Sequence, residues 1–203
     1  PWKFGSTSDA SRAYPTGKPM WEIVEYRGGY PTLKGGLQTN AAWATNTWPS
    51  TRIRHVLKQS GHGAYLWCVK SDTKIRDGYV EVQGKFISGD LDRIVGVVWR
   101  FQDEKNYYLA RAGPIEDSVV VFKVVNGLRI TVLGGRSDLI YMPADVWNLL
   151  RVDFSGSTFK VMWNGKVVCT ATDDNITGAG AVGLWTKTDA VSAFDNFSYG
   201  GLD

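Results

Sequence analysis

The chain has 203 residues, of which 43% are hydrophobic and 21% are charged, the balance of a soluble globular protein. The net charge is only +3 and no block of lysines and arginines occurs, so nucleic acid is not expected as a partner. No apolar run approaches the roughly 20 residues that a membrane-spanning helix needs, which predicts no transmembrane segment.

The first sixty residues predict mostly irregular structure that covers an edge or an end of a sheet. Residues 3–19 are rich in Ser, Gly and Pro and are expected to form a loop, and residues 41–52 are expected to form another. Short strands are expected at 21–26, 32–39 and 52–59.

From Ala64 onward, runs of β-branched and aromatic residues follow one another with turn signals between them. Strands are expected at 64–70, 77–86, 93–102, 106–112, 118–126, 128–135, 148–156, 158–165, 166–172, 180–187 and 193–199. The dipeptides Asp77–Gly78, Asn126–Gly127 and Asn164–Gly165 are typical of tight hairpin turns. Helical periodicity extends nowhere beyond about one turn.

This regular pattern predicts an all-β fold, either a two-sheet antiparallel sandwich or a closed barrel. No linker and no internal repeat divides the chain, so one domain is expected over residues 1–203. Its regular core is expected over residues 64–199.

Residues 95–112 predict a hairpin whose turn lies at 103–106. Because side chains alternate along a strand, one face is expected to carry Val98, Arg100, Gln102, Tyr107, Leu109 and Arg111. The opposite and more apolar face, which we assign to the core, is expected to carry Val97, Trp99, Phe101, Tyr108 and Ala110. The same alternation at 180–187 turns Val182 and Leu184 inward and Trp185 and Lys187 outward.

The polar side chains of this hairpin have two interpretations. Arg100 and Arg111 are expected diagonally across the strand pair, where their rigid guanidinium forks suit one anionic or polyhydroxyl ligand. Trp185 beside Lys187 adds an aromatic ring for the apolar face of a sugar and a donor for its hydroxyls. Alternatively, these side chains form an ordinary solvated sheet face, and a register shift of one residue inverts every assignment.

Tryptophan and cysteine usage leaves further alternatives open. Most of the nine tryptophans are expected to fill the core, with one or two serving as stacking platforms for sugars. Cys68 and Cys169 both lie in strand-like runs and fit no metal-binding spacing. They are expected either to form a disulfide in an oxidising compartment or to remain buried thiols.

Two stretches carry a resemblance to a known family. Residues 77–127, with "VVWRFQDEKNYY" followed by "ARA", and residues 179–197, with "VGLWTKTD", closely resemble the 3-keto-disaccharide hydrolase-like domains. These domains belong to the concanavalin A-like lectin/glucanase group and are often labelled family-16 glycoside hydrolase-like. The resemblance covers about two thirds of the chain, from Ala64 onward.

The resemblance implies a jelly-roll β-sandwich and a role linked to saccharides. It also implies an exported bacterial protein, periplasmic or secreted, whose signal peptide has been removed. On the concave face, the ligand contacts that it implies are Arg100, Tyr107, Arg111 and Trp185. Glu116 and Asp117 resemble an acidic pair that follows the matching strand of the family and are expected at the rim of the same groove.

Classical glycoside hydrolysis is not expected. The paired carboxylates of family-16 glucanases, in a Glu-x-Asp-x-x-Glu pattern, are absent, and Asp90 and Asp92 lie beside a glycine turn where carboxylates are usually solvated. If the protein is an enzyme, it acts as a glycoside hydrolase or as a lyase or hydrolase of 3-keto-glycosides. His55 and Glu116 are then the weak catalytic candidates, and His62 is expected in a loop.

No cofactor is expected, apart from a structural calcium ion for which Asp195 is a weak candidate ligand. The sequence therefore favours a single jelly-roll sandwich that binds an oligosaccharide or polysaccharide through a concave face. Its contacts are expected to be Arg100, Tyr107, Arg111, Glu116, Trp185 and Lys187. The alternatives are an enzyme acting in the same groove and a module that binds another protein. The oligomeric state is not predicted.

Overall fold

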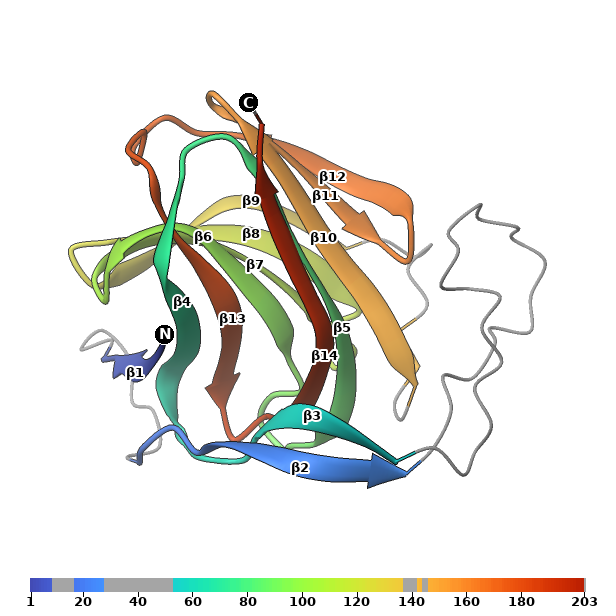
Figure 1. Ribbon diagram of the computed structural model, residues 1–203. Helices are drawn as coiled ribbons and strands as arrows, with labels where there is room; N and C mark the ends of the chain where they lie inside the picture. Colours follow the sequence, from blue (N-terminus) through green and yellow to red (C-terminus); the bar gives the residue numbers. More distant parts are fainter. Residues whose placement is uncertain (9–16, 28–52, 137–141, 144–145, 203) are drawn as a thin grey trace.

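The computed structural model describes residues 1–8, 17–27, 53–136, 142–143 and 146–202, which form two antiparallel sheets of seven strands each (Figure 1). In spatial order, sheet A consists of β1 (Trp2–Thr7), β4 (Gly63–Ile75), β13 (Gly180–Thr188), β6 (Val95–Asp103), β7 (Asn106–Gly113), β8 (Ser118–Val125) and β9 (Leu128–Arg136). Sheet B consists of β12 (Lys166–Thr172), β11 (Thr158–Trp163), β10 (Trp147–Ser155), β5 (Gly78–Ser88), β14 (Val191–Gly201), β3 (Ile53–Gln59) and β2 (Trp21–Arg27).

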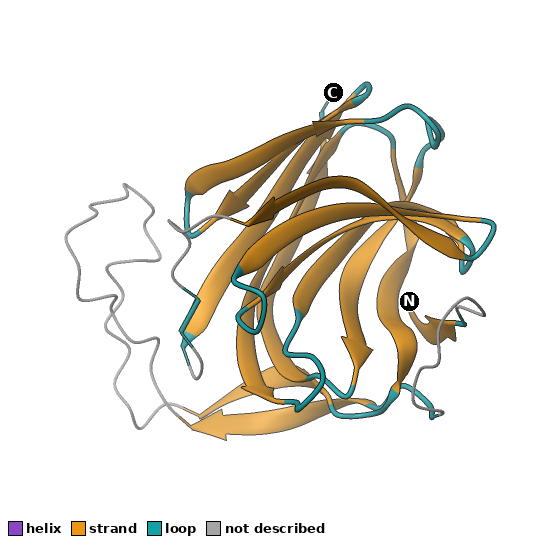
Figure 2. Cartoon of the chain, turned by 180° about the vertical axis from the view of Figure 1, so that it is seen from behind, coloured by secondary structure: helices purple, strands orange, loops and turns teal. Residues whose placement is uncertain are grey.

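The predicted all-β, two-sheet sandwich is confirmed. Figure 2 shows strands and loops throughout the described part of the chain. Within these residues no helix occurs that is long and apolar enough to cross a membrane. The Asn126–Gly127 and Asn164–Gly165 turns have positive φ at both residues, 53° and 83° in the first and 50° and 81° in the second. This is the backbone geometry that matches the twist of a two-residue hairpin.

The N-terminal strand departs from the prediction of a loop over residues 3–19. β1 pairs with β4 along its whole length, with Gly5 opposite Trp67. A Cβ atom on Gly5 would lie only 2.3 Å from Cζ2 of Trp67, so the indole occupies the space that a side chain would fill. The predicted strands at 21–26 and 52–59 correspond to β2 and β3. The strand expected at 32–39 and the loop expected at 41–52 lie outside the described residues.

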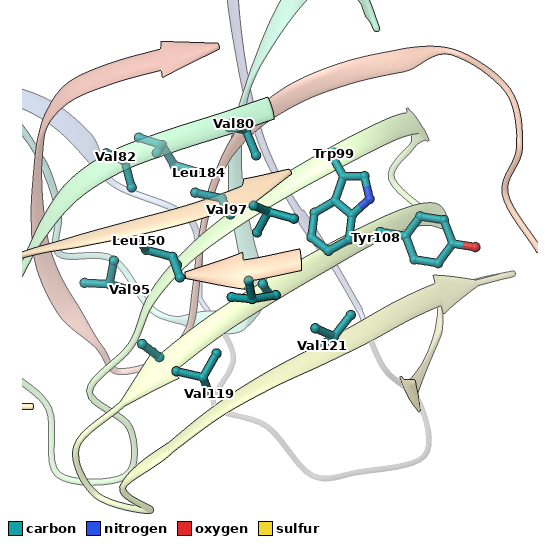
Figure 3. Close-up of a cluster of buried hydrophobic side chains, with 14 of the residues drawn as sticks. Val80, Val82, Val95, Val97, Trp99, Tyr108, Val119, Val121, Leu150 and Leu184 are labelled. Atoms are coloured by element: carbon teal, nitrogen blue, oxygen red, sulfur yellow. The ribbon is translucent and has the colours of Figure 1, made fainter. Parts of the chain in front are cut away.

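The main core lies between the two sheets, where Figure 3 shows side chains of both sheets in contact. The predicted inward residues Val97, Trp99, Tyr108 and Ala110 all belong to it. Trp99 stacks on Tyr108 with ring centroids 5.6 Å apart and meets Phe159 of sheet B edge-on at 5.2 Å. Such aromatic pairs contribute beyond the area that they bury.

A second apolar cluster covers the opposite face of sheet A, which we call the outer face. Its buried members are Tyr65, Trp67, Val69, Ile94, Val98, Tyr107, Leu109, Val120, Phe122, Val124, Ala181, Trp185 and Ala190. Sheet A curves strongly around this cluster, since the rings of Trp67 in β4 and Phe101 in β6 lie 4.9 Å apart although β13 runs between the two strands. The outer face is therefore concave and filled with the chain's own aromatic side chains.

The two cysteines are free thiols in this structure. Cys68 is buried in β4 of sheet A, and Cys169 is half-buried in β12 of sheet B. Of the two alternatives that the sequence left open, the structure contains the thiols and not the disulfide.

Candidate ligand-binding site

The structure brings most of the predicted ligand contacts to the outer face of sheet A. Tyr107 and Arg111 lie on β7, and Trp185 and Lys187 lie on β13. Gly96 of β6 pairs with both Arg111 and Trp185, which places these two residues on the same face, two strands apart. Glu116 lies in the turn between β7 and β8. The predicted alternation of these two segments is correct.

Arg100 does not join this group, and its predicted position was wrong. The register of β6 against β7 shifts between Trp99 and Asp103, and Arg100 has a positive φ of 47°. This bulge adds residues to one strand and changes the direction of the side chains that follow it. Phe101, which was predicted to be inward, consequently stacks on Tyr107 of the outer face, with ring centroids 5.1 Å apart.

The guanidinium of Arg100 instead connects β6 to three other chain segments at one end of the sandwich. It donates to the carbonyl oxygens of Arg76 at 2.8 Å, Ile176 at 3.0 Å and Gly156 at 2.7 Å, and to Oδ1 of Asp77 at 3.2 Å. The residue is 1% exposed. With its donors directed at protein oxygens, Arg100 has a structural role and is not available to a ligand.

Tyr107 and Trp185 form the floor of the outer face and are fully buried, so neither presents a surface to a ligand in this structure. The Tyr107 hydroxyl lies 3.2 Å from Oγ1 of Thr7, and burial raises the pKa of Tyr107 to about 12. The Trp185 ring stacks on Tyr65 with centroids 5.7 Å apart. It also passes over Gly96, where a Cβ atom would lie 3.2 Å from Cε3 of the indole.

Arg111 and Glu116 form an ion pair at the margin of this floor. Nη1 of Arg111 lies 2.8 Å from Oε2 of Glu116 and 3.1 Å from Oγ of Ser118. The Arg111 side chain is only 10% exposed, whereas that of Glu116 is 46% exposed. Burial lowers the pKa of Arg111, and the neighbouring carboxylate of Glu116 opposes this shift. Arg111 thus supplies a fixed guanidinium, and Glu116 supplies an accessible carboxylate.

Lys187 and Asp92 form a second ion pair, with Nζ 2.9 Å from Oδ2. The Asp92 side chain is 6% exposed and also accepts a hydrogen bond from the hydroxyl of Thr188. The expectation of a solvated Asp92 is therefore wrong. Its loop is fastened by the carboxylate of Asp189, which accepts hydrogen bonds from the backbone N–H groups of Asp90, Leu91 and Asp92 at 2.8 to 3.2 Å.

Arg129 of β9 also contacts the outer face and was not among the predicted ligand contacts. The centre of its guanidinium lies 4.9 Å from the Tyr65 ring centroid and 4.5 Å from that of Phe122. Arg111 interacts electrostatically with both Arg129 and Asp92. We call Asp92, Arg111, Glu116, Arg129 and Lys187 the charged rim. The regular alternation of residues 128–135 is the only signal that could have placed Arg129 on this face.

The weak catalytic and metal candidates are not brought together. His55 is exposed on β3 of sheet B, where it pairs with Glu25 in the β2–β3 ladder, and His62 is exposed in the loop after β3. Asp195 on β14 forms an ion pair with Arg54 at 3.1 Å. Among the described residues, no group of three or more His, Cys, Asp or Glu side chains is placed to hold a metal ion.

The chain was compared with family models, curated proteins and solved structures, and only solved structures match it. No family model and no curated protein matches the chain. Among solved structures, the carbohydrate-binding module CBM66 from Bacillus subtilis is 22% identical, covers 70% of this chain and 85% of its own length, and superposes with a TM-score of 0.62. A Bacillus subtilis protein of unknown function with a galectin-like fold is 11% identical over 88% of each chain, with a TM-score of 0.56.

The homodimeric agglutinin CG-16 from chicken liver is 12% identical, covers 65% of this chain and 98% of its own length, and has a TM-score of 0.51. At these identities the likeness concerns the fold. The chain therefore has a galectin-like β-sandwich of the concanavalin A-like type.

Proposed function

We propose that this protein binds an oligosaccharide or polysaccharide through the charged rim on the outer face of sheet A. The observation that carries this proposal is the convergence of Arg111, Glu116, Asp92, Lys187 and Arg129 beside a floor of aromatic rings. Sugars are recognised by fixed donors and acceptors that match their hydroxyls, and the buried rings beneath the rim hold these groups in place.

The rigidity of the rim supports this assignment. Arg111 is held by Glu116 and Ser118, and the loop that carries Asp92 is held by Asp189. Polar groups that are oriented before binding lose little freedom when a ligand arrives, which favours affinity. A fold shared with a carbohydrate-binding module and an agglutinin is consistent with this use.

We also propose that the chain belongs to the 3-keto-disaccharide hydrolase-like domains, because residues 77–127 and 179–197 resemble them. The same resemblance leads us to propose export to the periplasm or the medium. We infer binding without turnover. The paired-carboxylate pattern of family-16 glucanases is absent, and the rim carboxylates Asp92 and Glu116 are each engaged in an ion pair.

Calorimetric titration of a panel of neutral and acidic oligosaccharides tests this proposal, with each mixture assayed for product afterwards. The test variant is Arg111→Met, which removes the guanidinium and retains much of the apolar stem. Arg151→Met is the matched control, because Arg151 is also ion-paired, with Glu81 and Asp153, on the outward face of sheet B. Loss of hydrogen bonds to a charged group is expected to lower affinity by about tenfold or more in Arg111→Met.

The control variant is expected to bind as the wild type does, and both variants are expected to melt as folded proteins. Equal affinities in wild type and Arg111→Met, or no heat with any saccharide of the panel, contradict the proposal. Release of product by the wild type would assign an enzyme in place of a binding module.

A further inference from the structure

Arg129 is a half-buried cation whose charge has no anionic partner among the described residues. Its guanidinium lies between the rings of Tyr65 and Phe122, which come from opposite sides of the curved sheet. In the described part of the chain, no carboxylate or carbonyl oxygen accepts a hydrogen bond from it. The two rings stabilise the charge through cation–π contacts but leave the fork of N–H donors unused.

The other charges of the rim are arranged in pairs. Arg111 is paired with Glu116 and Lys187 with Asp92, at 2.8 Å and 2.9 Å. Arg129 is therefore an additional positive charge beside two neutral pairs. The charge of Arg129 disfavours the charge of Arg111, and an anion bound at Arg129 would relieve this repulsion.

Two buried tryptophans close the floor of the cluster on which Arg129 lies. Trp67 and Trp185 are directly opposite each other on β4 and β13. They are 7% and 0% exposed, and the Trp185 side chain interacts with the Tyr107 hydroxyl. A ligand therefore meets this face at its partly exposed margin, where Arg129 lies, and not at the buried floor.

We infer that the outer face of sheet A takes a saccharide that carries an anionic group, a carboxylate or a sulfate, and that Arg129 binds this group. The inference rests on the proposed function and specifies its ligand as an acidic glycan. The rings of Tyr65 and Phe122 both contact the guanidinium and limit its movement, and a planar fork of donors matches a carboxylate bidentately. Arg111 lies close enough to add long-range attraction for the same charge.

The test compares ligands that differ only in charge. Trigalacturonate and its trimethyl ester have the same backbone, and a sulfated disaccharide with its unsulfated parent provides a second matched pair. Each is titrated by calorimetry into wild type, Arg129→Met and the control Arg151→Met. The control is matched because the Arg151 guanidinium also lies over a tyrosine ring, that of Tyr79 at 4.1 Å, on the other sheet.

Wild type is expected to prefer the charged member of at least one pair by about tenfold, the usual worth of a charge-assisted hydrogen bond over a neutral one. This preference is expected to disappear in Arg129→Met and to persist in Arg151→Met. Raising the salt concentration from about 50 to about 500 mM should weaken binding of the charged ligand only. Arg129→Lys retains the charge but not the fork, and is expected to retain part of the preference.

Three outcomes overturn the inference, and they are distinguishable from one another. If wild type binds charged and neutral members equally, the anion site is wrong while saccharide binding stands. If Arg129→Met weakens both members to the same extent, Arg129 only packs against the aromatic rings. If no saccharide binds, the proposed function fails together with this refinement of it. Thermal melts of Arg129→Met and Arg129→Lys show whether both variants fold, and Arg129→Lys carries the comparison if Arg129→Met does not.

Discussion

Nη2 of Arg100 lies 2.7 Å from the carbonyl oxygen of Gly156, and Oδ1 of Asp77 accepts both from this guanidinium and from the Gly156 N–H. The turn between β10 and β11 is thus fastened to the turn between β4 and β5. Removing one partner of a buried, hydrogen-bonded charge leaves the other groups unpaired. Arg100→Met is therefore expected to lower the free energy of unfolding by about 3 kcal/mol or more.

Urea unfolding of Arg100→Met at neutral pH checks this value. Since Arg100 lies away from the charged rim, saccharide affinity is expected to be unchanged under conditions in which the variant is folded. A variant that unfolds like the wild type but loses saccharide binding would show that Arg100 contacts the ligand.

Because the Asp189 carboxylate accepts several backbone hydrogen bonds, we expect the free energy of unfolding to depend on pH in the acidic range. Burial alone would raise the pKa of Asp189, but the backbone N–H groups of Asp90, Leu91 and Asp92 lower it below the ordinary value. Because the folded-state pKa is lowered, this stabilisation is fully present above the unfolded-state value of about 3.9 and is lost as pH falls through the folded-state value. Asp189→Asn should be less stable than wild type at pH 7, and the difference should shrink below about pH 4.

Urea unfolding at several pH values between about 7 and 2 measures this difference. Asp174→Asn is the control, because Asp174 is an exposed aspartate in the loop before β13. A constant difference between wild type and Asp189→Asn at all pH values would show that the carboxylate charge does not fasten the loop.

We expect the thiols of Cys68 and Cys169 to react at different rates. Burial raises the pKa of Cys68 strongly and that of Cys169 to about 11, and the thiolate is the reactive form. A disulfide-exchange reagent at about pH 8 should therefore label Cys169 slowly and Cys68 only after unfolding. Mass spectrometry of the intact chain should find both thiols, and a reducing agent should leave the melting temperature unchanged. A mass lower by two hydrogens, or melting that depends on the reducing agent, would indicate a disulfide.

Alternation along the strands predicted much of the fold and part of the site. It separated Val97 and Tyr108, which face sheet B, from Tyr107 and Arg111, which do not. It failed at Arg100 because a bulge follows Trp99, and a bulge depends on the packing of the whole strand pair.

The burial of the outer face could not be predicted from alternation. An alternating strand shows which side chains share a face, but not that sheet curvature places Trp67 against Phe101 across an intervening strand. The Lys187–Asp92 pair was missed for a related reason. These residues are 95 positions apart, and only the paths of the strands bring them together.

Side chains pack on both faces of sheet A, so the strands beneath the charged rim are secured independently of the rim itself. Buried side chains of β6, β7 and β13 belong to the two apolar clusters, while Glu116 belongs to an exposed turn. Changes in such a turn are expected to alter recognition with little loss of folding free energy. The scaffold is accordingly suited to diversification: libraries that vary the exposed β7–β8 turn could be screened for altered ligand binding without redesign of the sandwich.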